Sequence, residues 1–456
     1  MPYGLGQLTS LQTLPLFVVS KDPIGSSKHC GGLAELNKLN DLRGRIYIIN
    51  LELVKDAILE TKAANLKEKQ HLSNLTLSWN SWFDDVINTG DDENLLDGLQ
   101  PPQNLKWLFV QSYRGVRFSN WLSSLTNLIE LKMYGCRKCQ HLPPLYQLPS
   151  LRKISLSKMC SLEYISDLDI TNEVSASSLT TFFPSLESLT LQKCPNLKGW
   201  WKRDIVDNRD ATIMTSTSSS SWSHQYHQHM SQPSFPRLSC LTIIDCSKLT
   251  SMPLFPYLEE ELDLRGVSWK ALQQTMAMKM NTAGASSLTS SIPPLSKLRR
   301  LYLWFMLDKE SLPEEWLQNL TSLEKLSINR CSVSLSQILR HLTSLKELSI
   351  EDCEEVDLFS DAFLQSVTTL QKLSIVRCPS LMTLPEWIGN LTSLQNLEIK
   401  DCPNLTSLPE GMRRLTSLLS LRIYKCPHLE QRCQKEIGED WTKIAHVPKY
   451  SNKFQT

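Results

Sequence analysis

Residues 323–331 read Leu-Glu-Lys-Leu-Ser-Ile-Asn-Arg-Cys. The pattern Leu-x-x-Leu-x-Ile-x-x-Cys in this stretch begins again at Leu345, Leu370, Leu394 and Leu418, so successive copies start 22, 25, 24 and 24 residues apart. A pattern of this kind with a period of roughly 20 to 29 residues is the signature of a leucine-rich repeat. This repeat therefore decides the fold.

The same pattern extends toward the N-terminus. Complete copies, each with its cysteine, begin at Leu128, Leu186 and Leu238. Composition agrees, because 77 of the 456 residues are Leu and only 16 are Gly, which favours one repetitive architecture over several unrelated domains. We count about fifteen repeats, since weaker copies fill the intervals. The weaker copies begin at Leu11, Ile46, Leu72, Leu105, Leu151, Leu262 and Leu298.

The central Leu-x-Ile of the repeat alternates with period two, which predicts a short strand with both apolar side chains on one face. A single repeat cannot bury that face, whereas stacked repeats bury a continuous core. We therefore predict an α/β leucine-rich-repeat solenoid, or horseshoe, with short parallel strands on the concave face and irregular or short helical convex connections. At roughly 4.8 Å per strand the inner edge is on the order of 70 Å long, enough for a protein partner.

Leu-Pro-Glu recurs in the segments between the predicted strands. The three copies begin at Leu312, Leu384 and Leu408. Proline fixes φ and lacks a backbone N–H, which suits an irregular convex side where no hydrogen-bond ladder is needed. We interpret these residues as structural.

Three interruptions of the repeat predict loops. They are the Ser- and His-rich segment 202–234, a segment from about Ala271 to Pro294, and an acidic stretch from Asp84 to Glu93. The first cannot bury enough apolar surface to order itself. The predicted organisation is an N-terminal repeat block at 1–201, the loop at 202–234, a C-terminal block at 235–433 and a tail or cap at 434–456.

The charge and hydropathy of the chain exclude several classes of protein. Lys and Arg number 48 against 47 Asp and Glu, so the formal charge of +1 does not draw the protein to nucleic acid or an anionic membrane. The longest apolar runs are far shorter than a membrane span, and the N-terminus lacks the pattern of a secretory signal. We predict a cytoplasmic or nucleo-cytoplasmic location.

No motif for catalysis or for cofactor binding stands out. The phosphate-binding loop and the HExxH and GxSxG patterns are missing, so we predict no enzyme activity and no cofactor. Cys136, Cys139 and His141 suggest zinc, but a structural site needs four ligands and no second pair follows at suitable spacing. Eight of the 13 cysteines instead occupy the last position of the repeat, which predicts a ladder of reduced, buried thiols.

The residue just before that cysteine alternates in charge over five consecutive repeats. It is Arg330, Asp352, Arg377, Asp401 and Lys425 in turn. Equivalent side chains on adjacent strands lie close enough to pair, each pair contributing about 0.2–1 kcal/mol. The alternation fits a self-neutralising ladder that fixes strand register, and it also fits a charged docking surface for a partner.

Aromatic residues occupy the outward positions around other Leu-x-Leu cores. Exposed aromatic side chains dominate protein interfaces. The strongest candidates are two clusters, Trp107 with Phe109, and Tyr302 with Trp304 and Phe305. The predicted partner-binding residues of the concave face are Trp79, Trp107, Phe109, Tyr302, Trp304, Phe305, Arg330, Arg377 and Tyr424, with Tyr134 as a further aromatic.

Several phrases are more specific than the leucine spacing. They are residues 1–14, the segment 39–53 with its Leu-Arg-Gly turn, the segment 98–105, Cys194-Pro-Asn-Leu and residues 438–446. These five segments resemble the repeat region of plant immune receptors. The family is that of the coiled-coil, nucleotide-binding, leucine-rich-repeat (NLR) disease resistance proteins. The resemblance covers nearly the whole chain.

The resemblance implies a recognition and autoregulatory role. In that family the repeats sense pathogen effectors, directly or through a guarded host protein, and help to hold the receptor's nucleotide-binding switch domain inactive. The phosphate-binding loop and coiled coil lie upstream in such receptors, so the chain resembles their C-terminal portion and nucleotide binding is not assigned to it. The implied partners are therefore proteins, with no nucleic acid and no membrane span.

Other functions fit the repeat less well. A stand-alone leucine-rich-repeat adaptor remains an alternative, as does a ubiquitin-ligase substrate receptor, although no F-box-like helical segment precedes the repeats. An extracellular receptor or enzyme inhibitor needs a signal peptide and paired capping cysteines, and neither is found.

Overall fold

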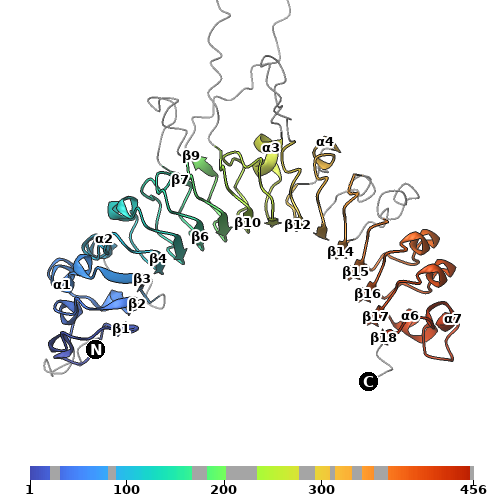
Figure 1. The fold of residues 1–456 in the computed structure, drawn as a ribbon, viewed down its shortest axis with the longest axis horizontal. Coiled ribbons are helices and arrows are strands. Elements are labelled where there is room, and N and C mark those ends of the chain that lie inside the picture. The colour runs from blue at the N-terminus through green and yellow to red at the C-terminus, as the bar shows by residue number, and fades with distance from the viewer. Residues whose placement is uncertain are drawn as a thin grey trace, which may run out of the picture. The chain divides into compact units, whose positions relative to one another are not determined.

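The computed structural model describes residues 1–20, 31–80, 89–166, 182–201, 234–276, 293–308, 314–330, 341–353 and 368–451. The chain divides into two compact units. Unit 1 comprises Met1–Leu186, Asn196–Pro236 and Ser251–Leu254, and unit 2 comprises Glu187–Pro195, Arg237–Thr250 and Phe255–Thr456. Within each unit the strands lie side by side along one side, and the helices and turns occupy the opposite side (Figure 1).

Unit 1 contains six strands of the main parallel sheet, and they pair in chain order. A separate pair, β7 (Tyr164–Ser166) and β9 (Gly199–Trp201), lies on the side of the turns. The main strands are β1 (Leu16–Val18), β2 (Arg43–Ile49), β3 (His71–Ser78), β4 (Trp107–Gln111), β5 (Glu130–Tyr134) and β6 (Lys153–Ser157), and the helices are α1 (Ala57–Ala64) and α2 (Thr89–Gly98).

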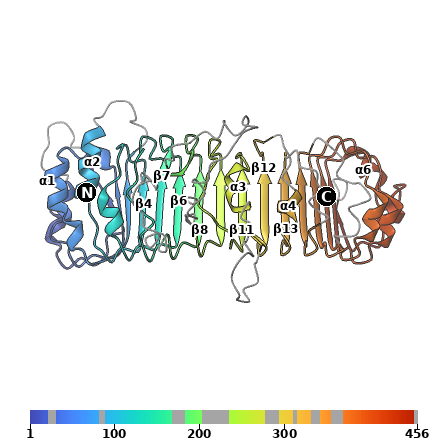
Figure 2. The same ribbon diagram turned by 90° about the horizontal axis from the view of Figure 1, so that it is seen from above.

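Unit 2 contains ten strands of the same kind, again parallel and in chain order, as Figure 2 shows from above. The strands are β8 (Ser188–Gln192), β10 (Cys240–Ile244), β11 (Glu261–Arg265), β12 (Arg300–Trp304), β13 (Lys325–Asn329), β14 (Glu347–Glu351), β15 (Lys372–Val376), β16 (Asn396–Lys400), β17 (Ser420–Tyr424) and β18 (Lys449–Ser451). The helices are α3 (Lys270–Met276), α4 (Glu314–Leu317), α6 (Pro427–Arg432) and α7 (Trp441–Ile444).

The leucine positions of the repeat form the core of each unit. In β14 and β15, Leu348 is in register with Leu373 and Ile350 with Ile375, and all four side chains are buried. Stacked apolar rows of this kind remove each repeat's inner face from water, which a single repeat cannot do. The predicted leucine-rich-repeat solenoid with parallel strands is confirmed.

The cysteine ladder is also confirmed for the described cysteines, and Cys331 lies outside them. The thiol of Cys402 donates to the Lys400 carbonyl at 3.4 Å, and burial raises the pKa of the Cys136 thiol to about 12. A protonated thiol in the core is a weak nucleophile, so Cys136 has a structural role. The buried members are Cys136, Cys194, Cys246, Cys353, Cys378, Cys402 and Cys426.

The residue after each main-sheet strand from β4 to β17 adopts a left-handed conformation. In ten of the twelve cases, all but Lys158 and Lys425, its N–H donates to the last carbonyl of the next strand, as from Asp352 to Val376 at 3.0 Å and from Arg377 to Lys400 at 2.9 Å. The left-handed region costs a non-glycine residue about 1–2 kcal/mol, and the extra ladder bond returns about 1 kcal/mol. We call this position the strand-end position. Its members are Ser112, Gly135, Lys158, Lys193, Asp245, Gly266, Phe305, Arg330, Asp352, Arg377, Asp401 and Lys425.

The Leu-Pro-Glu motif connects neighbouring repeats. Pro385 precedes a short 3-10 helix at Glu386–Asn390, and the carboxylate of Glu386 accepts the backbone N–H groups of Glu410 and Gly411 at 3.0 and 2.8 Å. These N–H groups begin the next 3-10 helix and have no partner within it. The glutamate therefore caps the following turn, and Leu312 and Pro313 of the first motif copy lie outside the described residues.

Two predicted loops are wrong in part. The C-terminal end of the acidic stretch is helix α2, because Leu95 and Leu96 bury themselves in unit 1 and Asp92 is bound to buried partners. The segment predicted from Ala271 begins inside helix α3, whose Leu272 is buried. Residues 81–88, 202–233 and 277–292 lie outside the described residues.

Candidate recognition surface

Strands β2 to β5 of unit 1 present two rows of outward side chains. In the first row Arg45, Asn74, Trp107 and Glu130 lie in register from strand to strand. In the second row Tyr47, Thr76, Phe109 and Lys132 do the same. We call the surface formed by these two rows, together with Arg43 of β2 and Lys153 of β6, the basic-aromatic face.

The basic-aromatic face is hollowed at its centre. Strand β3 contributes the short side chains of Asn74 and Thr76, whereas its neighbours contribute long ones, Tyr47 on β2 and Trp107 and Phe109 on β4. The result is a hollow of about 170 Å³ with aromatic walls, and Arg45 and Lys132 also line it.

The aromatic side chains of this face are open to solvent. Trp107 is 46% exposed and Tyr47 is 39% exposed, while Phe109 is half-buried. Sequence reasoning missed Tyr47 and Arg45. Tyr47 stands between Ile46 and Ile48, as Phe109 stands between Leu108 and Val110, and this alternation is the signal that could have found it.

The prediction that Trp79 belongs to the exposed face is wrong. Its side chain is 2% exposed, and Nε1 donates to Oδ1 of Asp92 at 2.9 Å. The Asp92 carboxylate also accepts a hydrogen bond from Nε of Arg114 at 2.9 Å. The ring of Tyr113 packs edge-on against Trp79, with the ring centres 5.2 Å apart. Trp79 is the residue after β3, and its side chain turns into the core, where α2 supplies a polar partner for its indole.

The other aromatic cluster, Tyr302 with Trp304 and Phe305, lies on unit 2, and its side chains contact neighbouring residues of that unit. The guanidinium of Arg265 lies 4.1 Å from the centre of the Trp304 ring, whose Nε1 donates to Ser327 at 3.0 Å. Lys325 lies over Tyr302 at 5.8 Å. Phe305 is more exposed, although Arg330 lies 5.5 Å from its ring centre.

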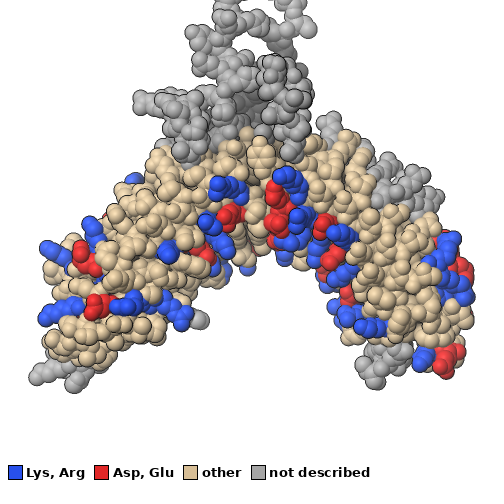
Figure 3. Space-filling model, viewed as in Figure 1, with Lys and Arg blue, Asp and Glu red and all other residues tan. Residues whose placement is uncertain are grey.

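Alternating charges form ion pairs along the strand-end positions of unit 2. Asp352 lies 3.5 Å from Arg330 and 3.0 Å from Arg377, and Lys425 lies 3.4 Å from Asp401. The hydrogen bond to Asp352 raises the pKa of the Arg377 guanidinium. Basic and acidic side chains alternate along the strand side of this unit (Figure 3). The pairs support a register-fixing ladder, and the docking interpretation stays a prediction.

Reversing one charge tests the ladder. Asp401→Lys places two cations side by side, so we expect it to lower the free energy of unfolding by about 0.5–1 kcal/mol, the range of a partly exposed pair. The measurement is thermal unfolding by circular dichroism. Asp401→Asn is the matched control, since Asn tolerates the left-handed conformation and removes only the charge. An unchanged melting temperature for Asp401→Lys contradicts a structural ladder.

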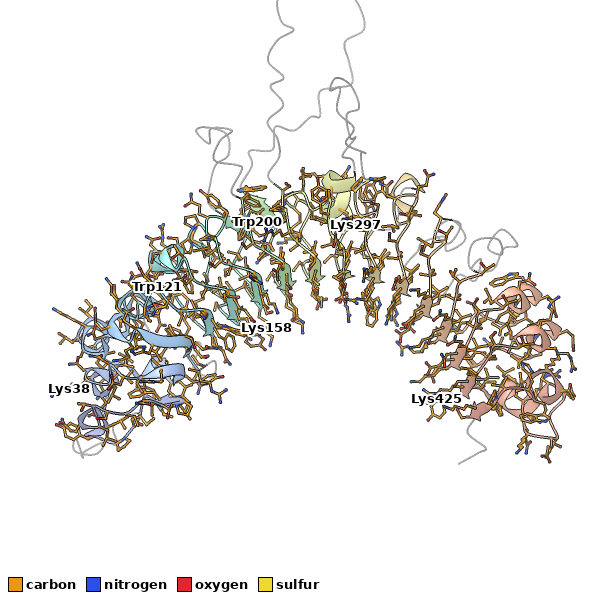
Figure 4. All side chains as sticks on the ribbon, in the orientation of Figure 1. Lys38, Trp121, Lys158, Trp200, Lys297 and Lys425 are labelled. Atoms are coloured by element: carbon orange, nitrogen blue, oxygen red, sulfur yellow. The ribbon has the colours of Figure 1, made fainter. Side chains whose placement is uncertain are left out.

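The remaining predicted residues stand on the strand sides of the units. Tyr424 is exposed and lies beside Lys425, whose ammonium is 5.7 Å from the ring centre. In unit 1, Lys158 lies over Tyr134 at 4.6 Å. Figure 4 shows Lys158 and Lys425 on the strand sides of their own units, whereas Trp121 and Trp200 of unit 1 lie among its turns.

Neither a metal centre nor a membrane span emerges from the described part of the chain. No three His, Cys, Asp or Glu side chains there are grouped to hold a metal ion. None of its helices is long and apolar enough to cross a bilayer.

Comparison with solved structures gives only distant likenesses. A leucine-rich-repeat protein of Leptospira interrogans aligns over 98% of this chain and 97% of its own, with 18% identity and a TM-score of 0.44. An internalin of Listeria monocytogenes aligns over 81% of this chain and 89% of its own, with 15% identity and a TM-score of 0.36. The fold assignment rests on the registered strands themselves.

Comparison with protein families and relatives is more specific. Residues 33–159 and 354–426 match the family described as R13L1/DRL21 LRRs. RGA4 and RGA2 of Solanum bulbocastanum, both of which carry the name disease resistance protein, are 32% and 31% identical over 331 residues, or 71% and 72% of this chain. The chain spans about a quarter of their lengths, 27% and 26%. Repeat, fold and relatives together show that the chain is a leucine-rich-repeat region of the plant NLR disease resistance protein family.

Proposed function

We propose that this module is a non-catalytic recognition surface of an intracellular plant immune receptor. Its strand side binds a protein ligand, which is a pathogen effector or a guarded host protein. Through the nucleotide-binding switch domain of the same receptor, that contact regulates signalling. The disease resistance relatives support the defence role, and the surface geometry supports the binding role.

The observation that carries the proposal is the exposure of Trp107 and its neighbours on the basic-aromatic face. Trp and Tyr supply a large contact area at low cost in side-chain entropy and are the side chains most often found at interface hot spots. Here Trp107 and Phe109 stand on a parallel ladder whose hydrogen bonds hold the backbone. A surface that is ordered before contact loses less free energy on binding.

Alanine substitution at the two aromatic clusters tests this function. We expect Trp107→Ala, or the triple variant Tyr302→Ala, Trp304→Ala and Phe305→Ala, to weaken binding by about thirtyfold or more, the loss typical of a hot spot. The measurement is surface plasmon resonance against cloned effectors and host proteins that bind the unaltered chain.

Tyr257→Ala is the control, because Tyr257 is equally exposed but precedes β11 and is not on the strand face. Far-UV circular dichroism must stay unchanged in every variant. Ligand binding that survives both the Trp107 and the triple substitutions contradicts a strand-face site.

A further inference from the structure

We propose that the basic-aromatic face of unit 1 takes an acidic segment of a protein partner, with one large apolar side chain of that segment seated in the hollow. This inference rests on the proposed function and adds the chemistry of the ligand. It draws on three observations: the charge of the face, the ion pairs on the strand side of unit 2, and the size and walls of the hollow.

Cations dominate the basic-aromatic face. Glu130 is the only acidic residue in strands β2 to β6, and it is 8% exposed and bound to Lys132 at 2.8 Å. Arg43, Arg45 and Lys153 are exposed, and no ion pair to them exists among the described residues. An incoming carboxylate therefore meets cations that are not already neutralised. Such a field raises the rate of association as well as the affinity.

The strand side of unit 2 differs, because several of its cations already have acidic partners. Lys325 pairs with Glu347 at 3.2 Å and Arg300 with Glu261 at 3.2 Å. Arg265 pairs with Asp263 at 2.7 Å, in addition to its stacking on a Trp ring. An anionic ligand gains less at these paired cations, since it has to displace an existing carboxylate. The strands of unit 2 also carry five acidic residues, whereas β2 to β6 carry one. Charge complementarity thus selects unit 1 for an acidic partner.

The size and walls of the hollow determine which apolar side chain of the partner segment it accepts. Its volume of about 170 Å³ is close to the roughly 150 Å³ of an apolar cavity that accepts benzene. Tyr47, Trp107 and Phe109 form its walls, so it fits the ring of a Phe or the branched end of a Leu. Arg45 also lines the hollow, where a carboxylate beside that anchor residue can reach it, and Lys132 lines it together with its partner Glu130.

Selection of short random peptides displayed on phage, with the full chain as bait, tests the inference. We expect the selected peptides to carry Asp or Glu on both sides of a Phe, Trp or Leu. Synthetic copies should bind the unaltered chain, lose affinity as salt rises, and lose about tenfold or more in the double variant Arg43→Glu, Arg45→Glu.

The matched control is the double variant Lys372→Glu, Lys400→Glu. It changes the net charge by the same amount but alters the strand side of unit 2. We expect it to bind the acidic peptides as the unaltered chain does. An equal loss in both double variants means that only net charge matters, which overturns the site.

The other outcomes separate the two proposals. Selected peptides that are not acidic but still need Trp107 overturn the acidic chemistry and leave the proposed function standing. Peptides whose binding is indifferent to Trp107 and to the triple variant of unit 2 overturn the proposed function itself. A single-stranded oligonucleotide that binds this face more tightly than the acidic peptides overturns the assignment of a protein ligand.

Discussion

Asp440→Ala is expected to lower the free energy of unfolding by about 3–5 kcal/mol. The Asp440 side chain is fully buried, and its carboxylate accepts the backbone N–H of Leu408 at 3.0 Å, Nε of Arg432 at 3.0 Å and Nζ of Lys443 at 2.9 Å. Alanine leaves a buried N–H without a partner and removes the buried counter-ion of two cations, which keep only the exposed partners Glu439 and Glu410. Urea unfolding at neutral pH measures the change.

Glu439→Ala is the control for this variant. Glu439 pairs with the same Arg432, but its carboxylate is 74% exposed, so we expect a loss below about 0.5 kcal/mol. Hydrogen exchange of Asp440→Ala should show the residues around Leu408 and α7 losing protection first, since Asp440 joins them. Similar losses in the two alanine variants contradict the buried network.

Acid should remove the contribution of Asp440 to the free energy of unfolding. Burial raises the pKa of this carboxyl, but the hydrogen bonds from Arg432, Leu408 and Lys443 outweigh it, and the pKa in the folded chain is lowered. A lowered folded pKa stabilises the chain above the unfolded pKa of about 3.9, and the contribution is lost as pH falls through the folded value. The stability gap between the unaltered chain and Asp440→Ala is therefore full at neutral pH and closes in strong acid.

Asp92→Ala is expected to cost about 3–5 kcal/mol, the range for one partner removed from a buried ion pair. Asp92 and Arg114 are both almost fully buried in unit 1, and the same carboxylate accepts the indole N–H of Trp79. Removing it leaves a guanidinium and an indole N–H buried without their acceptor. Urea unfolding measures the change, and hydrogen exchange should place it in unit 1, around β3 and α2.

Asp91→Ala is the matched control, because Asp91 precedes Asp92 on α2 and is exposed. We expect it to change stability by less than about 0.5 kcal/mol. If Asp91→Ala and Asp92→Ala lower the free energy of unfolding equally, the lost stability comes from the helix and not from the ion pair.

The core could be predicted from the sequence because its pattern is local. Leu348 and Leu373 occupy the same place in successive repeats, and a period of 25 residues sets them side by side once the strands are parallel. The buried thiols could be predicted from the same repeat period, because each cysteine occupies the last position of its repeat. Neither inference needs any knowledge of how one side chain meets another.

The hollow and the buried pair could not be predicted in this way. The hollow exists because Asn74 and Thr76 are short while Tyr47 and Phe109 are long, which is a comparison across three strands. The indole of Trp79 is buried because Asp92, in a stretch that interrupts the repeat, folds back as a helix. The repeat pattern describes what repeats share, and these features depend on how neighbouring repeats differ.

The left-handed strand-end position has a consequence for how such a module changes over time. Its hydrogen bond uses only the backbone, and the conformational cost is similar for Ser, Lys, Arg and Phe, all of which occupy it here. Exchanging one of these side chains for another therefore alters the chemistry offered to a ligand while the sheet stays as it is. Mutation can therefore change the binding specificity at a dozen such positions with little loss of stability. Residues whose side chains also pack in the core cannot be exchanged in this way without destabilising the fold.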